Sequence, residues 1–373
     1  MFLALRNKSF QKFKKIETKI HELNYLFWEC TSRCNLSCLH CGSDCSKHGS
    51  SEDMPLTDFL SALDTIKSKP DNFTVVITGG EPLLRKDIEI CGREIRKHGV
   101  RWSMVSNGYL YDQQKHISLL NAGLGALTIS LDGLEENHNW LRNTNNSFSK
   151  VDTAIGLAAS SSRLNFDVVT CVNKRNIHEL PSIYNYLISK GVKSWRLFTI
   201  VPIGRAKNKP DLLLTDFQFK ELLDFITLKR KQKSIDIKFS CEGYVGKYEL
   251  KVRDSFFFCR AGINIGSILI DGSISACPNI DRTFSQGNIY KDNFYEIWES
   301  KYQSFRDRSW TKTGQCEKCL DYSYCHGNGL HNWNKNKENV LICHNGKIEK
   351  KRNANIKLSN NCFKNLTSLI LPG

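Results

Sequence analysis

Three cysteines lie close together near the N-terminus, in the stretch CNLSCLHC at residues 34–41. Three residues separate Cys34 from Cys38, and two separate Cys38 from Cys41. A structural zinc ion, or a four-iron cluster bound only by protein, takes four thiolates. A four-iron cluster held by three thiolates leaves one iron open to a ligand that is not protein. The alternative is a zinc loop, completed by one of three nearby residues: Cys30, Cys45 or His40.

A second group of cysteines lies in the last third of the chain. Cys259, Gly272 and Cys277 form the pattern C-x12-G-x4-C. The stretch CEKCLDYSYC and a later cysteine supply four more thiols, at Cys316, Cys319, Cys325 and Cys343. Four thiolates with an x2 spacing can hold a four-iron cluster or a zinc ion.

Short apolar strands that alternate with amphipathic helices must position the first cysteines. We expect strands at residues 25–29, 73–77, 102–106, 126–131, 166–172 and 194–200. Glycine or small polar residues follow these strands in turn, in the cysteine loop, TGGEP, SNG, SLDG, Asn173 and PIGRA. The alternation predicts a parallel sheet, either a partial barrel or an open doubly wound sheet. Because ligands bind at the carboxyl ends of parallel strands, the motifs predict one ligand crevice.

The cysteine loop followed by GGEP resembles the radical S-adenosylmethionine (SAM) superfamily. This resemblance implies a partial (β/α)6 TIM-like barrel and a [4Fe-4S] cluster on Cys34, Cys38 and Cys41, whose open iron binds SAM. It implies SAM contacts from ten residues: Gly79, Gly80, Glu81, Pro82, Ser106, Asn107, Ser130, Asp132, Arg142 and Asn173. Arg142 is expected to pair with the SAM carboxylate. His40, where the family usually has an aromatic residue, is expected to stack on the adenine. No general base stands out.

The second group of cysteines resembles the SPASM domain of radical SAM enzymes, which usually carries two auxiliary four-iron clusters. The resemblance implies one intact auxiliary [4Fe-4S] cluster, on Cys316, Cys319, Cys325 and Cys343. The other set departs from the family pattern, because Gly329 and Ile265 stand where cysteines are usual. Cys259 and Cys277 remain, with Cys241 as a candidate replacement. We therefore expect the second auxiliary cluster to be degenerate or absent.

The composition is that of an ordinary globular protein, with 40% hydrophobic and 24% charged residues among 373. The net charge of +15 suits an acidic partner or solvated lysine-rich faces, and its even spread along the chain favours the second. No signal peptide or membrane span is recognisable, which predicts a cytoplasmic protein in which clustered cysteines bind metal. We expect four segments: a basic lead-in (1–24), a radical SAM core (25–235), a SPASM domain (240–345) and a polar basic tail (346–373).

The resemblances imply an enzyme that cleaves SAM reductively to a 5′-deoxyadenosyl radical, which abstracts hydrogen from a substrate. Stretches such as WECTSRCNLSCLHCGSDC also resemble the subfamily of the rSAM/lipoprotein system, which implies a neighbouring lipoprotein partner. SPASM enzymes mostly modify peptides, so we expect a peptide or protein substrate, with flavodoxin or ferredoxin as electron donor. The alternatives are a small-molecule enzyme of cofactor maturation and a non-catalytic iron–sulfur or zinc scaffold. A nucleic-acid partner is not expected, since no RNA-binding module is recognisable.

Overall fold

The computed structural model describes residues 2–333, 336 and 339–348. Within them, ten strands form one sheet in the order β10-β9-β8-β1-β2-β3-β4-β5-β6-β7. Strands β1 to β7 pair in parallel with their neighbours, and β8 pairs in parallel with β1. The pairs β8–β9 and β9–β10 are antiparallel. The strands are β1 (Tyr25–Thr31), β2 (Thr74–Gly79), β3 (Arg101–Ser106), β4 (Leu124–Ser130), β5 (Asn165–Val172), β6 (Ser194–Thr199), β7 (Asp236–Phe239), β8 (Ile265–Ile268), β9 (Ser273–Ser275) and β10 (Gly287–Asn288).

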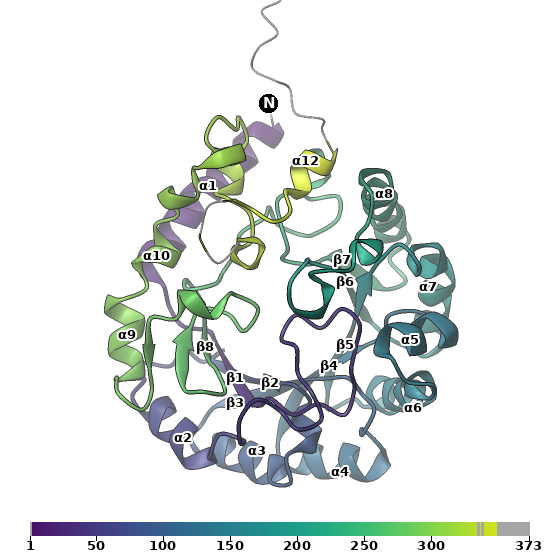
Figure 1. The fold of residues 1–373 in the computed structure, drawn as a ribbon, viewed down its shortest axis with the longest axis vertical. Helices are drawn as coiled ribbons and strands as arrows, with labels where there is room; N and C mark the ends of the chain where they lie inside the picture. The colour runs from purple at the N-terminus through teal and green to yellow at the C-terminus, as the bar shows by residue number, and fades with distance from the viewer. Residues whose placement is uncertain (1, 334–335, 337–338, 349–373) are drawn as a thin grey trace, which may run out of the picture.

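The sheet curves into a barrel that does not close, with β10 and β7 at its two ends. Figure 1 shows helices α2 to α8 around the outside of this sheet, so the partial barrel is confirmed and the open doubly wound sheet is wrong. The helices are α1 (Phe2–Ile20), α2 (Leu56–Asp64), α3 (Ile88–Lys97), α4 (Gln113–Asn121), α5 (Glu135–Arg142), α6 (Ser147–Ser160), α7 (Leu180–Ser189), α8 (Asp216–Gln232), α9 (Phe294–Ser300), α10 (Gln303–Arg306), α11 (Tyr322–Cys325) and α12 (His344–Ile348).

Apolar stripes on the helices bury the outer face of the sheet. On α3 the buried residues Ile88, Cys91 and Ile95 recur at helical spacing, which turns one face of the helix toward the core. Trp28 of β1 stacks on Phe59 of α2, with ring centroids 4.2 Å apart. Strands β1 and β2 carry continuous buried runs because helices cover them on one side and the barrel interior lies on the other.

The C-terminal part of the chain extends the same sheet. β8 pairs with β1 through Tyr25 and Ile265, so the sheet runs on from the barrel into the cysteine-rich module. β7, which the sequence analysis did not predict, pairs with β6 at the other end of the barrel. The segment limits at 235 and 240 stay predictions. The predicted tail (346–373) lies outside the described residues from residue 349 onward.

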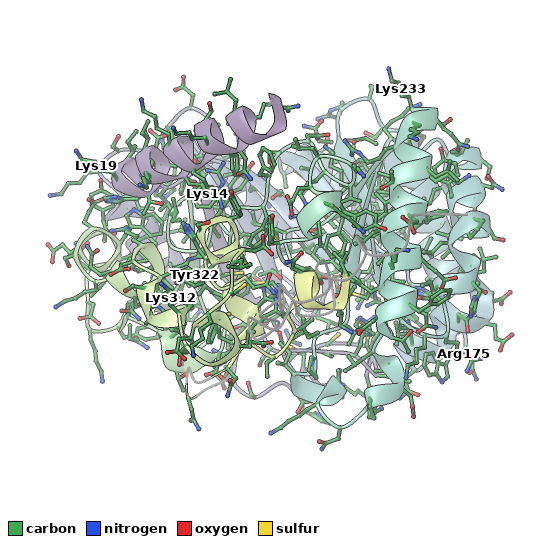
Figure 2. All side chains as sticks on the ribbon, turned by 90° about the horizontal axis from the view of Figure 1, so that it is seen from above. Lys14, Lys19, Arg175, Lys233, Lys312 and Tyr322 are labelled. Carbon is green, nitrogen blue, oxygen red and sulfur yellow. The ribbon has the colours of Figure 1, made fainter. Side chains whose placement is uncertain are left out.

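Helix α1 packs on the cysteine-rich module, although the two lie at opposite ends of the sequence (Figure 1). Glu17 of α1 forms an ion pair with Arg260 at 2.8 Å, and the Phe10 ring lies 5.4 Å from that of Phe256. The basic side chains are spread over the molecule, and Lys19 and Lys233 project from different sides (Figure 2). None of the described helices combines the length and apolar character needed to cross a membrane.

Candidate metal and cofactor site

The cysteine loop follows β1 at the carboxyl ends of the parallel strands. Cys34 and Cys38 are buried and Cys41 is half-buried, and all three pack in one apolar cluster with Leu36. The PIGRA segment after β6 holds this loop in place. Arg205 donates from Nε to the Cys38 carbonyl at 2.7 Å, and its backbone N–H donates to the Cys41 carbonyl at 3.0 Å. The structure therefore joins the first and last motifs of the predicted crevice.

Cys45, which the sequence analysis named as one possible fourth ligand of a zinc loop, belongs to the same apolar cluster. Its thiol donates a hydrogen bond to the sulfur of Cys41, and this bond is the main cause that lowers the pKa of Cys41 to about 5. Burial raises the pKa of Cys34 to about 11. The Cys45 thiol thus favours the thiolate form of one loop cysteine, the form that binds iron. Its place in the same loop was the signal that could have identified it.

The other two residues that could complete a zinc loop lie elsewhere. Cys30, a residue of β1, is fully buried in the main hydrophobic core. His40 belongs to the group His40, Asp132 and Cys171, the only such group among the described residues whose ligand atoms all lie within 4.8 Å of one another. Arg142 lies 2.5 Å from Asp132, so its positive charge opposes a cation there. Cys34, Cys38 and Cys41 are spaced more widely than one ion requires, which suits a four-iron cluster.

The glycines of TGGEP lie against the start of the cysteine loop. A Cβ at Gly79 would collide with the Thr31 carbonyl oxygen, and one at Gly80 with that of Arg33. Gly79 also has a φ of +141°, which side-chain-bearing residues rarely adopt. The Gly80 N–H donates to the Thr31 carbonyl at 2.8 Å. Glycine is therefore required here for the close approach of two backbone segments.

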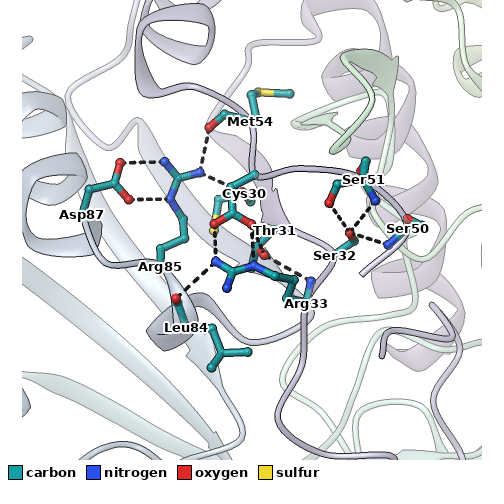
Figure 3. Close-up of polar contacts among 11 residues, drawn as sticks. Cys30, Thr31, Ser32, Arg33, Ser50, Ser51, Met54, Leu84, Arg85 and Asp87 are labelled. Carbon is teal, nitrogen blue, oxygen red and sulfur yellow. Dashed lines mark hydrogen bonds and ion pairs between the residues drawn. The ribbon is translucent and has the colours of Figure 1, made fainter. Parts of the chain in front are cut away.

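Two arginines connect the same segments (Figure 3). Arg85 donates from Nη1 to the carbonyls of Cys30, at 2.8 Å, and Met54, at 2.7 Å, and pairs with Asp87. Arg33 donates to the Leu84 carbonyl at 3.3 Å. These bonds hold the end of β1 to the turn that contains TGGEP, because each guanidinium has several N–H donors and bonds more than one segment at once.

Glu81 connects the TGGEP turn to the SNG motif after β3. Its fully buried carboxylate accepts hydrogen bonds from the Leu83 N–H at 3.1 Å, the Ser106 hydroxyl at 2.9 Å and the Asn107 N–H at 2.7 Å. Burial raises the pKa of this carboxyl above its usual range, although the three donors favour the charged form. Pro82 begins the short helical turn that follows. The Glu81 side chain therefore positions the loops of the predicted SAM site.

Glu81→Ala is expected to lower the free energy of unfolding by on the order of 3 kcal/mol, because it leaves three buried donors without an acceptor, each costing about 1–3 kcal/mol. Urea denaturation of the cluster-loaded protein measures this loss. Glu94→Ala, which removes an ion pair with Lys97 on the surface of α3, is the control and should cost less than about 1 kcal/mol. Equal losses in the two variants would contradict the role given to Glu81.

Asp132 and Arg142 form a buried ion pair beside the cysteine loop. Arg142 Nη2 lies 2.5 Å from Asp132 Oδ2, and its Nη1 lies 3.6 Å from the sulfur of Cys38. Burial acts to raise the pKa of Asp132, but the guanidinium of Arg142 holds that pKa below its usual value. The sequence analysis expected two separate SAM contacts. In the structure the two residues are partners of each other as well.

The remaining predicted SAM contacts differ in what they touch. Asn107 donates from Nδ2 to Asn35 at 2.8 Å and contacts the sulfur of Cys34 at 3.8 Å, which places it next to the loop cysteines. Ser130 is half-buried at the end of β4. Asn173 is buried, and its Oδ1 accepts from the N–H of Arg175 at 2.8 Å. Its side chain thus shapes the turn after β5, and its contact with SAM stays a prediction.

Several buried polar atoms around the loop have no hydrogen-bond partner among the described residues. They are Asn35 Nδ2, His40 Nδ1, Arg142 Nε and, apart from its ion pair with Arg142, Asp132 Oδ2. A buried donor without a partner costs about 1–3 kcal/mol, so such a group of atoms beside three cysteines indicates a polar ligand. Asn35 Nδ2 belongs to an amide and Arg142 Nε to a guanidinium, and both kinds of group donate hydrogen bonds to carboxylates. The residues present therefore fit a cluster-bound molecule that carries a carboxylate, such as SAM.

The C-terminal cysteines form two sets. The thiols of Cys316, Cys319 and Cys343 all lie within electrostatic range of the Cys325 thiol, whose pKa burial raises. Cys343 also accepts a hydrogen bond from the Gly346 N–H at 3.3 Å. The four predicted ligands of the intact auxiliary cluster are therefore brought together. A second set is formed by Cys241, Cys259 and Cys277, each within electrostatic range of the other two.

A cavity of about 610 Å³ lies between the cysteine loop and the cysteine-rich module. Its lining includes Gly42, Ile203, Lys207, Asn279, Arg282 and His331. Gly42 belongs to the cysteine loop, Ile203 and Lys207 to the segment after β6, and the others to the C-terminal module. Its volume lies in the range of typical ligand sites, and its walls come from the end of β1, the cysteine loop, the PIGRA segment and the C-terminal module.

Comparison with known families agrees with this geometry. A sequence model of the radical SAM superfamily matches residues 28–187, and one of an iron–sulfur cluster-binding domain, SPASM, matches residues 259–320. The chain is a radical SAM enzyme with a SPASM domain. It uses SAM, a [4Fe-4S] cluster and auxiliary clusters, as these two domains imply.

Curated relatives of this radical SAM enzyme have different substrates. It is 25% identical over 320 residues to the AdoMet-dependent heme synthase of Nitratidesulfovibrio vulgaris, covering 80% of this chain and 85% of the relative. It is 27% identical over 310 residues to the mycofactocin maturase MftC of Mycobacterium tuberculosis, covering 81% and 77%. The solved structure of anSMEcpe with bound AdoMet and Cp18Cys peptide shares the fold, with a TM-score of 0.68, 21% identity and coverage of 87% and 94%.

The N-terminal helix of this radical SAM enzyme contributes a buried lysine that the sequence analysis missed. Lys14 donates to the Tyr324 carbonyl at 2.7 Å, on the side of α1 that faces the SPASM domain (Figure 2). Burial, followed by repulsion from Arg308, lowers its pKa to about 8. It shares a small cavity with Cys259 of one cysteine set and Cys325 of the other. A basic lead-in of 24 residues carries too little pattern to predict such a contact.

Proposed function

We propose that this radical SAM enzyme removes a hydrogen atom from a peptide or protein substrate bound in the 610 Å³ cavity. When bound, the cluster and SAM supply one-electron cleavage of the sulfonium and the 5′-deoxyadenosyl radical that takes the hydrogen. One observation carries the proposal: the loop of the three cysteines, which has buried polar atoms without partners around it, contributes Gly42 and Ser43 to one wall of a large cavity, and the SPASM domain forms another wall.

The residues of the chain would divide the work as follows. Cys34, Cys38 and Cys41 hold the cluster, and the Cys45 thiol favours the thiolate of Cys41. Arg142, whose Nε lacks a partner, binds the SAM carboxylate while its Nη2 stays paired with Asp132. The two carboxylates then share one guanidinium, which has five N–H donors and can serve both. The buried surroundings keep water away from the reacting centre.

A polypeptide substrate is favoured by the shape and the chemistry of the cavity. Half of its walls belong to the SPASM domain, and its volume is sufficient for a few residues of an extended chain. Lys207 and Arg282 line it together with Glu29 and Asp281, and Arg282 pairs with Glu29 at 2.8 Å, so the charge of the walls favours neither an acidic nor a basic segment. A lipoprotein partner and a flavodoxin or ferredoxin electron donor stay predictions.

A small acidic molecule is the second candidate, favoured by the similarity to heme synthases. The same two basic residues, Lys207 and Arg282, would then bind its carboxylates. A tetrapyrrole is wider than an extended peptide and would use the whole cavity at once. The two candidate substrates therefore differ in how they fill the cavity.

The test is the formation of 5′-deoxyadenosine by anaerobically reconstituted enzyme with SAM and dithionite. Three proteins are compared: the wild type, the variant C34A/C38A/C41A and the control Cys91→Ala, which changes a buried cysteine of α3 outside every cysteine set. Each is incubated alone, with candidate peptides encoded near its gene, or with an iron porphyrin. We expect product from the wild type and the control and none from the triple variant.

The arms separate the candidates. Stimulation by a peptide, with deuterium transferred from the labelled peptide to 5′-deoxyadenosine, would support the peptide proposal. Stimulation by the porphyrin alone would replace it with the small-molecule function. No product in any arm, from protein with a full iron content, would contradict catalysis and favour the scaffold alternative.

A further inference from the structure

Helix α1 carries two neighbouring rows of exposed side chains. The apolar row consists of four large side chains that are 39% to 62% exposed: Leu5, Phe13, Ile16 and Ile20. The lysine row consists of four exposed basic side chains: Lys8, Lys12, Lys15 and Lys19. We propose that the two rows bind α1 to the surface of an anionic lipid bilayer. This inference concerns where the enzyme binds and does not depend on its substrate.

The period of the helix places each row on one side of α1. At about 100° per residue, the apolar side chains fall within an arc of about 80° and the lysines within an adjacent arc of about 60°. Lys14 belongs to neither arc, because it is buried and donates to the Tyr324 carbonyl of the SPASM domain. Figure 2 shows Lys14 on the inner side of the helix and Lys19 projecting outward. The two rows therefore face away from the domain on which α1 packs.

The charge of the lysine row is not neutralised along the helix. Within the described residues, none of the four lysines takes part in an ion pair. Glu17 is the only acidic residue of α1, and it is paired with Arg260 at 2.8 Å. Two other carboxylates lie beyond the C-terminal end of the helix: Glu22, and Glu299, which is 3.3 Å from His21 Nε2. An anionic surface would therefore find four uncompensated positive charges in one line.

A convex apolar row with lysines beside it suits a lipid surface. The acyl region of a bilayer takes up the apolar side chains of a helix that lies in its plane, while the lysines reach the headgroups. Each lysine close to an anionic surface raises the partition coefficient about fivefold. An acidic protein would need a groove that matches the row, whereas a bilayer adapts to it. A second copy of the chain is disfavoured, because both copies carry a net charge of +15.

The experiment measures co-sedimentation of the cluster-loaded full chain with lipid vesicles under anaerobic conditions. Vesicles of phosphatidylcholine are compared with vesicles that also contain about 30% phosphatidylglycerol, at about 0.1 M salt. We expect binding to the anionic vesicles only. The partition coefficient should fall at least about tenfold at about 0.5 M salt, because ions screen the attraction between the lysines and the headgroups.

Two variants test the rows separately. Replacing the lysine row, in K8Q/K12Q/K15Q/K19Q, should lower the partition coefficient at least about 100-fold. Replacing three members of the apolar row, in L5S/I16S/I20S, should lower it at least about tenfold. The matched control makes the same change in net charge at four exposed lysines elsewhere, and should bind within about fivefold of the wild type: K86Q/K150Q/K193Q/K220Q. Equal iron content in all four proteins checks that these exposed substitutions leave the fold intact.

Three results would overturn the proposal. They are a wild type that does not sediment with the anionic vesicles, equal weakening in the lysine-row variant and the control, and wild-type binding by L5S/I16S/I20S. A wild type that does not bind vesicles but forms a dimer through these rows, or binds an acidic protein such as flavodoxin through them, would assign the surface to that partner instead.

Discussion

Arg142→Met is expected to lower the free energy of unfolding by about 3–5 kcal/mol at neutral pH, because it breaks a buried ion pair from one side. The Asp132 side chain is 1% exposed and lies 2.5 Å from the guanidinium. Without that cation, the carboxylate is a buried charge that only hydrogen bonds compensate, such as the one from the Cys171 N–H at 2.8 Å. Methionine fills much of the volume of the arginine stem, so lost packing contributes little.

Urea denaturation at pH 7.5, at equal cluster content, measures the effect. The matched control is Arg175→Met, which breaks an exposed pair with Glu136 and should cost less than about 1 kcal/mol. The double variant R142M/D132N should recover much of the loss, since it removes the uncompensated charge as well. A loss in Arg142→Met no larger than in the control would disprove the role of this buried pair.

The pH dependence of this loss has a defined sign. In the wild type the pKa of Asp132 is held low, so the pair stabilises the protein above about pH 4 and the stabilisation falls away below that. In Arg142→Met, burial raises the pKa of Asp132 above its usual value, and the carboxyl takes up a proton as the pH falls. The difference between variant and wild type should therefore be smaller at pH 5 than at pH 7.5.

Acidification below pH 6.5 is expected to destabilise the fold through His138 by about 1.4 kcal/mol per pH unit. His138 is fully buried on α5. Its Nδ1 accepts a hydrogen bond from the Asp132 N–H at 3.1 Å, so Nε2 carries the proton and donates to the Ser147 hydroxyl at 3.0 Å. A second proton would place two N–H groups face to face. Burial, followed by repulsion from Arg142, lowers the pKa of His138 to about 3.

The sign of the linkage follows from these two pKa values. In the unfolded chain the histidine has a pKa of about 6.5, so below that pH the unfolded state binds the proton more tightly. The contribution of neutral His138 to the free energy of unfolding is fully present above pH 6.5 and decreases as the pH falls toward the folded pKa of about 3. Over the whole window the loss reaches on the order of 5 kcal/mol.

The measurement compares urea unfolding of the wild type and His138→Gln at pH 7.5, 6.5 and 5.5. This range extends about one pH unit on either side of the pKa of histidine in the unfolded chain. The glutamine side chain can accept a hydrogen bond at its oxygen and donate one from its nitrogen without titrating. The free energy of unfolding of His138→Gln should therefore change less with pH, by the slope that one histidine contributes. His178→Gln, an exposed histidine after β5, is the control and should keep the slope of the wild type. Parallel curves for wild type and His138→Gln would show that His138 does not carry the pH dependence.

The sequence by itself determined the chemistry at the cysteine loop. Only cysteine supplies thiolates, and the spacing of Cys34, Cys38 and Cys41 ahead of GGEP resembles that of the radical SAM superfamily, so these three residues are recognisable as candidate cluster ligands without a structure. The glycines of TGGEP are recognisable for a similar reason, since Gly79 and Gly80 occupy positions that no Cβ can share with the neighbouring backbone. Long apolar strands with amphipathic helices between them likewise determined the parallel barrel, whose first six strands were predicted.

Only the tertiary structure decided which of these residues meet. The sequence predicted Arg142 and Asp132 as two separate ligand contacts, because their ion pair depends on how α5 packs after β4. Lys14 and Cys259 lie 245 positions apart in sequence and share one cavity because α1 packs on the SPASM domain. The strand β7, with four residues, is too short to show a period. Such contacts between side chains depend on backbone positions that no spacing rule contains.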